Sequence, residues 1–527
     1  LMLLGACNSS SPISPRERSD FNADWRFHLG DGLQAAQPGF AANDWRVLNL
    51  PHDWAIEGDF SRENPSGTGG GALPGGVGWY RKTFSVDNAD IGKIFRIEFD
   101  GVYMNSEVFI NGVSLGVRPY GYISFSYNLT PYLKWDEPNV LAVRVDNAEQ
   151  PNSRWYSGCG IYRNVWLTKL NPVHVAQWGT YVTAEEVSKN SARLKIRTSL
   201  QYDVETQTED SVQQADGTYV VFDSEIIPLI DVVLQSRLVD ADGHVVGEAV
   251  SEAQLMPVAP AEMEQEIELK NPNLWSIDAP YMYKVESILK NKETGEVLDR
   301  YYTPTGIRTF RFDAQKGFIL NGEQVKINGV CMHHDLGCLG AAVNTRAIER
   351  QLEILKEMGC NGIRCSHNPP APVLLDLCDE LGFLVMDEAF DEWLLAKNKT
   401  DNYYSESLAY GSSMFFTNHA KEDLTAMLRR DYNHPSVVIW SIGNEIPEQS
   451  SVDGVKILKF LQDICHQEDS SRMVTSACDN IAAVEPIRTL REFENALDVV
   501  GYNYVGRWRE RAETFYEEDR KEYPERR

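Results

Sequence analysis

Alternating apolar and polar residues indicate that the first third of the chain is a β unit. The segment 79–84 has this period-two pattern, which is typical of strands with one buried face. Another strand-like run ends in Asn111-Gly112, a strong signal for a tight hairpin. The loop 155–162 is rich in aromatic residues and glycine. We expect residues 21–170 to form a β-sandwich of the jelly-roll type.

A second series of short apolar segments follows. Segments 194–196, 231–234 and 283–285 read as strands separated by turns. About seven strands in a unit of this length are typical of an immunoglobulin-like β-sandwich. We expect this fold for residues 171–308, in which no catalytic residue stands out.

Beyond residue 309 strand-like and helix-like patterns alternate. The expected strands are 325–330, 362–365, 383–386, 437–440, 473–476 and 499–502. Between the first two, Ile348, Leu352 and Leu355 share one helical face. We therefore expect residues 309–527 to hold about six repeats of a (β/α)8 TIM barrel. The alternative is a doubly wound open sheet, but no glycine-rich phosphate loop follows any of these strands.

The composition is that of a soluble globular protein, with 43% hydrophobic and 24% charged residues. The net charge of −27 disfavours nucleic acid and anionic membrane surfaces as partners, because both need basic footprints. The nine cysteines contain no CxxC pair. We therefore interpret them as small buried residues, not as metal ligands or disulfides.

Residues 4–7 (Leu-Gly-Ala-Cys) resemble the lipobox of bacterial lipoproteins, and a polar Ser/Pro tether follows at 8–15. This resemblance implies that residues 1–20 are a remnant lipoprotein signal and tether and that Cys7 carries lipid. The protein is then exported, as a periplasmic or outer-membrane lipoprotein of a Gram-negative bacterium. The lipid anchor would be its only contact with a membrane.

Polar residues crowd the expected strand ends, where TIM barrels carry their catalytic groups. These residues are His333, His334, Asp335, Arg364, His367, Asp387, Glu388, Asn444, Glu445, Asn503 and Tyr504. Glu445 follows the apolar strand 437–440 and an expected turn at 441–443, so its carboxyl group should face the pocket and serve as a general acid. Asn444 can donate and accept hydrogen bonds. Arg364 would be costly to bury unpaired, so it should face a carboxylate or solvent.

Two segments carry a resemblance to glycoside hydrolase family 2. Residues 431–445 (Asp-Tyr-Asn-His-Pro-Ser-Val-Val-Ile-Trp-Ser-Ile-Gly-Asn-Glu) look like its acid/base signature over their full length. Residues 361–369 resemble its other signature, with Asn368 where tyrosine is common. The expected order of three domains also agrees with this family, and the resemblance implies that the first of them, residues 21–170, binds sugars.

The resemblance implies a retaining exo-β-glycosidase that works by double displacement. It also implies roles for individual residues: proton donor for Glu445, contact with the sugar 2-hydroxyl for Asn444, the sugar subsite for His333, His367 and Tyr504, and proximity to the nucleophile for Arg364. The family's nucleophile is a Glu on the seventh strand, and we assign it to no residue of this chain. Glu513, Glu517 and Glu518 are poor candidates because they lie in a charged helix-like stretch. A chain of these 527 residues alone is therefore expected to be inactive.

The stretch 331–337 resembles bacterial β-galactosidases, so terminal β-galactosyl residues of oligosaccharides are the expected substrate. β-Glucuronidase, β-mannosidase and a non-catalytic carbohydrate-binding protein remain alternatives, and a homo-oligomer is compatible with the sequence. Some β-galactosidases hold a magnesium ion with a Glu and a nearby His. Here Glu392 is present, but Leu394 occupies the histidine position. We therefore assign no metal ligands and no certain cofactor. If a divalent cation binds, magnesium or calcium is the expected one.

Overall fold

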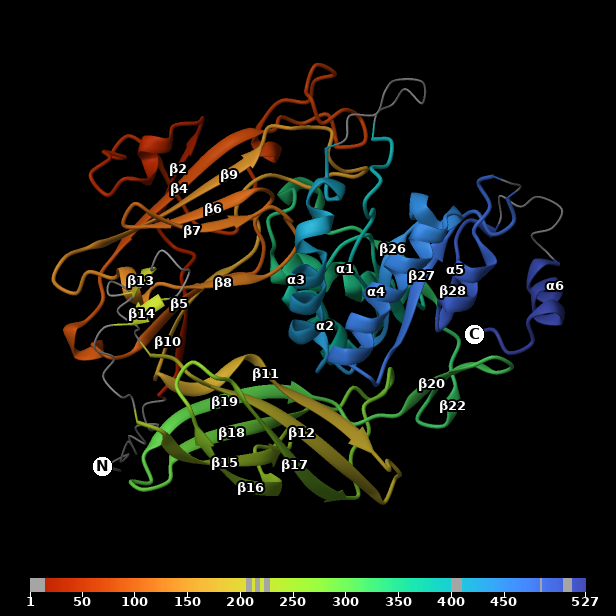
Figure 1. Cartoon of the computed structure of the whole chain (residues 1–527). Helices are drawn as coiled ribbons and strands as arrows, with labels where there is room; N and C mark the ends of the chain where they lie inside the picture. Colours follow the sequence, from red (N-terminus) through yellow and green to blue (C-terminus); the bar gives the residue numbers. More distant parts are fainter. Residues whose placement is uncertain are drawn as a thin grey trace, which may run out of the picture.

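The computed structural model describes residues 15–204, 211–213, 219–221, 228–399, 410–483, 486–505 and 514–527. Cys7 and Glu513 lie outside the described residues. Figure 1 shows two β-sandwiches, one formed by the red and orange part of the chain and one by the olive and green part. Both lie against an α/β unit drawn in teal and blue. None of the described helices is long and apolar enough to cross a membrane.

The N-terminal unit is an antiparallel β-sandwich, as predicted. A six-stranded sheet in the order β3-β2-β4-β9-β6-β7 faces a four-stranded sheet in the order β1-β10-β5-β8. Its core is formed by alternate residues of both sheets, including the buried side chains of Trp25, Tyr80 and Phe99. The strands are β1 (Glu17–Asp20), β2 (Trp25–Leu29), β3 (Arg46–Leu48), β4 (Gly76–Phe84), β5 (Ile94–Phe99), β6 (Ser106–Ile110), β7 (Val113–Arg118), β8 (Phe125–Asn128), β9 (Asn139–Asn147) and β10 (Val165–Leu170).

The second unit is also an antiparallel sandwich. A three-stranded sheet, β11-β12-β17, packs on a four-stranded sheet, β16-β15-β18-β19, around Leu194, Ile196, Leu238 and Val285. The strands are β11 (Val173–Glu185), β12 (Ser191–Tyr202), β15 (Ile230–Val239), β16 (Val245–Leu255), β17 (Ala261–Lys270), β18 (Tyr283–Asn291) and β19 (Val297–Thr305). A short antiparallel pair, β13 (Ser211–Gln213) and β14 (Tyr219–Val221), lies between β12 and β15 in the sequence.

The α/β unit contains a six-stranded parallel sheet in the order β23-β24-β25-β26-β27-β28. Its strands are β23 (Gly329–Met332), β24 (Gly362–Cys365), β25 (Leu384–Glu388), β26 (Val437–Asn444), β27 (Met473–Cys478) and β28 (Val499–Tyr502). The helices are α1 (Thr345–Glu357), α2 (Pro372–Leu381), α3 (Ser413–Asp431), α4 (Val452–Glu468), α5 (Arg491–Ala496) and α6 (Phe515–Glu522). A small antiparallel sheet of β20 (Phe310–Asp313), β21 (Gly317–Leu320) and β22 (Glu323–Gln324) precedes them. The strand order follows the chain order, as in a barrel wall.

Two details of the predicted strands were wrong. The first strand was expected at 325–330, but Val325 still donates its N–H to the Phe318 carbonyl at 3.0 Å, so this part of the run belongs to the preceding hairpin. Parallel pairing begins only at Gly329. The expected turn at 441–443 is instead part of β26, whose pairing with β27 shifts register between Ser441 and Asn444. In this stretch the Trp393 indole and the Ser476 hydroxyl donate to the carbonyls of residues 442 and 443 at 2.9 and 3.0 Å.

Direct contacts fix the N-terminal sandwich on the α/β unit. Arg163 is buried and donates hydrogen bonds to the carbonyls of Pro369 and Pro370 at 2.8 and 3.0 Å. Tyr120 donates to the Ala389 carbonyl at 2.5 Å, just beyond the end of β25. These buried bonds hold two loops of the sandwich, residues 119–124 and 148–164, against the segments that follow β24 and β25.

Candidate active site

The carboxyl ends of the six parallel strands meet at one edge of the sheet. All residues with a predicted site role in the described chain lie at this edge: His333, Arg364, His367, Asn444, Glu445 and Tyr504. Glu517 and Glu518, which were predicted to be poor candidates for the nucleophile, lie exposed on α6. The parallel arrangement therefore gathers residues more than 170 positions apart in the chain, from His333 to Tyr504.

Glu445 is the first residue after β26 and has a φ of 49°. This left-handed conformation is uncommon for a residue with a side chain and is typical of functional positions. Its side chain is 10% exposed, and Nδ2 of Asn503 donates a hydrogen bond to Oε1 at 3.0 Å. Nη1 of Arg154 lies 3.8 Å from Oε2. The carboxyl group is thus oriented by an amide and faces a single guanidinium.

Asn444 is buried and connects several groups of the site. Its Oδ1 accepts hydrogen bonds from Arg364 at 2.8 Å and from Asn503 at 3.3 Å. Its Nδ2 donates to Oδ1 of Asp391 at 2.8 Å. The side-chain amide is therefore held in one orientation beside Glu445.

Arg364 faces a carboxylate, as predicted for a buried arginine. It forms a bidentate pair with Glu388, whose side chain is fully buried, at 2.8 to 3.1 Å. Glu388 also contacts Nδ1 of His367 at 2.6 Å and accepts a hydrogen bond from Ser441 at 2.6 Å. Burial alone would raise the pKa of Glu388, but the charge of Arg364 and the bonds from His367 and Ser441 hold it below its usual value. Glu388 is therefore an anion with its oxygens fully engaged.

Aromatic rings line the other side of the site. His333 stacks on Trp155 with ring centroids 5.0 Å apart, and His367 meets the same indole edge-on at 5.6 Å. Burial lowers the pKa of His333, and the neighbouring His367 ring adds to this effect. Tyr504, with a φ of 54°, lies 47% exposed after β28. The imidazole of His333 and the indole of Trp155 thus form an aromatic surface at this edge.

A charged network beside Glu445 was not predicted from the sequence. Asp391 accepts two hydrogen bonds from Arg154, at 2.8 and 3.2 Å, and a third from Lys397 at 2.8 Å. Burial alone would raise the pKa of Asp391, but the charges of Lys397 and Arg154 hold it well below its usual range. Asn503 was placed at an expected strand end, but no role was predicted for it. The available signals were the Asp-Glu-x-x-Asp spacing that begins in the last two residues of β25 and the aromatic loop that begins beside Arg154.

The candidate cation position at Glu392 is taken by protein groups. Its Oε2 accepts hydrogen bonds from Nζ of Lys399 at 2.7 Å and from the N–H of Lys397 at 2.9 Å. Its Oε1 accepts from the N–H of Ser413 at 3.1 Å. Leu394 offers no ligand atom and is 45% exposed. The residues at this position therefore do not fit a divalent cation.

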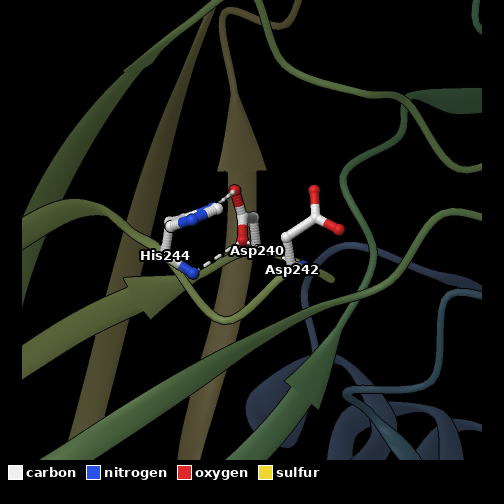
Figure 2. A group of neighbouring side chains, drawn as sticks. All are labelled: Asp240, Asp242 and His244. Atoms are coloured by element: carbon white, nitrogen blue, oxygen red, sulfur yellow. Dashed lines mark hydrogen bonds and ion pairs between the residues drawn. The ribbon is translucent and has the colours of Figure 1, made fainter.

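A second group of potential metal ligands lies far from this edge, in the turn between β15 and β16 (Figure 2). Asp240 accepts hydrogen bonds from the N–H groups of Asp242 and His244 at 3.0 and 2.8 Å. These bonds lower the pKa of Asp240, that from His244 foremost. Asp242 and His244 are exposed. The cluster is explained by the turn that Asp240 stabilises.

Three family models cover most of the chain. They describe the sugar binding domain of glycosyl hydrolases family 2 at residues 72–171, a further domain of glycosyl hydrolases family 2 at 173–308 and the TIM barrel domain of that family at 313–523. The two β-sandwiches and the parallel α/β unit of the structure follow one another in this same order. The chain belongs to glycoside hydrolase family 2.

Similar proteins include a β-galactosidase and a putative β-glucuronidase. The β-galactosidase BoGH2A of Bacteroides ovatus is 59% identical over 95% of this chain and 58% of its own length. A putative β-glucuronidase of Formosa agariphila is 37% identical over 88% of this chain and 40% of its own length. This chain thus spans about half the length of the relatives it matches.

Solved structures show the same architecture. A glycosyl hydrolase family 2 member from Bacteroides cellulosilyticus superimposes with a TM-score of 0.84 at 36% identity, covering 97% of this chain and 60% of that structure. A β-glucuronidase from Bacteroides uniformis gives a TM-score of 0.79 at 26% identity, with 97% and 58% coverage. The sugar-binding, immunoglobulin-like and TIM-barrel domains of the family are therefore the fold of this chain.

Proposed function

We propose that this chain carries the acid/base half of a retaining exo-β-galactosidase that removes terminal β-D-galactosyl residues from oligosaccharides. The observation that carries the proposal is Glu445, a single weakly exposed carboxyl group at the carboxyl end of a buried strand, oriented by Asn503 and flanked by Arg154. The β-galactosidase from B. ovatus, at 59% identity, supports galactose as the sugar.

In this mechanism Glu445 first protonates the glycosidic oxygen and later removes a proton from the attacking water. Asn444 holds the sugar 2-hydroxyl, because its amide is fixed beside the carboxyl group. His333, His367 and Tyr504 form the sugar subsite. Substrate binding excludes water from the face where Trp155 and His333 stack, which strengthens each hydrogen bond to the sugar.

The nucleophile is a carboxylate other than Glu388 and Asp391. Glu388 is engaged by Arg364 and His367, and Asp391 by Arg154 and Lys397. A nucleophile needs a free lone pair about 5–5.5 Å from the acid/base. We propose that the six strands belong to an eight-stranded barrel and that the nucleophile approaches Arg364.

The test uses the natural protein on p-nitrophenyl β-galactoside, β-glucuronide and β-mannoside. We expect the β-galactoside to have by far the highest kcat/KM and NMR to show the β-anomer as first product. A preference for the glucuronide or mannoside would replace the sugar assignment, and an α-anomer as first product would contradict the retaining mechanism. Galactose binding without any turnover would favour a carbohydrate-binding protein.

We also propose that Cys7 is lipidated and that the protein is an exported lipoprotein of a Gram-negative bacterium. The lipobox-like residues 4–7 and the polar segment 8–15 support this. We propose domain boundaries at residues 20, 170 and 308. The assembly we propose as compatible with the sequence is a homo-oligomer.

A further inference from the structure

Two lysines lie buried beside the proposed acid/base. Their side chains are 8% exposed for Lys397 and 2% exposed for Lys399. Both follow β25 in the sequence. Buried lysines are rare unless they are paired, and removing the partner of a buried charge is strongly destabilising. Their partners therefore indicate what the two ammonium groups do.

Lys397 lies next to the residues of the proposed mechanism. Its ammonium group donates to Oδ1 of Asp391 at 2.8 Å and to the backbone carbonyl of Asn444. The same Asp391 oxygen accepts the hydrogen bond from the Asn444 amide at 2.8 Å. Lys397 thus fixes both the backbone and, through Asp391, the side chain of the residue that precedes Glu445.

Lys399 forms a second buried ion pair, next to that of Lys397 and Asp391 in the sequence. Its ammonium group donates a hydrogen bond to Oε2 of Glu392 at 2.7 Å, and both side chains are 2% exposed. A divalent cation at Glu392 would have to displace this ammonium group and leave it buried without a partner. Lys397 and Lys399 therefore supply positive charge where a divalent cation does not fit.

We propose that Lys397 is a positioning residue whose ammonium group performs the role of a divalent cation beside the acid/base, so that hydrolysis needs no divalent metal ion. This proposal rests on the proposed function. The local charges agree with it: Arg154 and Lys397 face Asp391 and Glu445, so the group is neutral when Glu445 is ionised.

The first test measures cation binding and does not depend on enzymatic activity. The melting temperature of the natural protein is measured with MgCl2, with CaCl2, with EDTA and with NaCl at matched ionic strength. We expect the salts to be equivalent, because Lys399 occupies Glu392. A rise specific to magnesium or calcium that Glu392→Gln removes would overturn the proposal, even if the protein hydrolysed no galactoside.

The second test measures kinetics on p-nitrophenyl β-galactoside and lactose. We expect EDTA to leave the wild-type rates unchanged and Lys397→Ala to lower kcat by about tenfold to a hundredfold, because a misplaced strand end costs that much. Ethylammonium should restore part of the loss, whereas tetramethylammonium, which has no N–H group, should not. Lys456→Ala removes a lysine that is 72% exposed on α4 and should match the wild type.

Two outcomes separate this role from a structural one. Lys397→Gln keeps a donor toward Asp391 without the charge, and should fold while remaining slow. Wild-type kcat in folded Lys397→Gln, or loss of wild-type activity in EDTA, would overturn the proposal. If the wild type hydrolyses no glycoside at all, the proposed function fails, and the melting temperatures still decide whether a divalent cation binds.

Discussion

Replacing His434 tests how the start of β26, the strand that leads to Glu445, is anchored. Nδ1 of His434 lies 2.6 Å from Oδ2 of Asp379 in α2, and the other Asp379 oxygen accepts the N–H of Ser436 at 3.0 Å. Burial alone would lower the pKa of His434, but the charge of Asp379 and the hydrogen bond between them raise it from 6.5 to about 9. Such a shift corresponds to about 3 kcal/mol of stability.

The pH dependence of this stability follows from the direction in which the pKa of His434 is shifted. Because the pKa is raised in the folded protein, this stability is fully present below about pH 6.5 and is lost as the pH rises through about 9. We therefore expect His434→Gln to lower the free energy of unfolding most at about pH 6, and to lower it by about 3 kcal/mol less at about pH 10.

The assay is urea unfolding followed by tryptophan fluorescence at several pH values, with wild type and variant compared at each. His244→Gln is the matched control, because His244 also contacts an aspartate but its side chain is 76% exposed, and exposed pairs contribute little. Its pH dependence should equal that of the wild type. A difference between His434→Gln and wild type that stays constant with pH would refute the reasoning.

Three further predictions concern other parts of the chain. Arg364→Met should destabilise the fold by about 3–5 kcal/mol because Glu388 is left buried with its main cation removed; an unchanged urea midpoint would contradict this, and adding Glu388→Gln should recover part of the loss. A polypeptide limited to residues 1–527 should not turn over aryl β-galactosides, since Glu388 and Asp391 are held in ion pairs; saturable activity that Glu445→Ala removes would show otherwise. Cys7→Ser should move the protein from the detergent phase to the aqueous phase in phase partitioning, and wild type already in the aqueous phase would exclude the lipid anchor.

The sequence predicted the residues of the site better than their pairing. His333, Arg364, His367, Asn444 and Glu445 could be placed because each lies in the last residues of an apolar strand or directly after it, and parallel strands bring their carboxyl ends together. The pattern of apolar residues locates the strands, and the strand ends locate these site residues.

The missed residues lie in loops or depend on contacts between side chains. Arg154 comes from the first sandwich, 291 residues before Glu445, and reaches it only because the sandwich packs on the strand ends. Lys397 has no periodic signal, and its role is defined by Asp391 and Asn444. Similarly, the apolar run at 325–330 gave no indication that its first residue pairs with a hairpin.

The most direct test of the central claim is the leaving-group dependence of Glu445→Gln in the natural protein. An alkyl alcohol leaves poorly without a proton, whereas an activated phenol needs almost none. We expect kcat/KM on lactose to fall by about 10²–10⁴ and on 2,4-dinitrophenyl β-galactoside by far less. An equal loss on both substrates would show that Glu445 is not the acid.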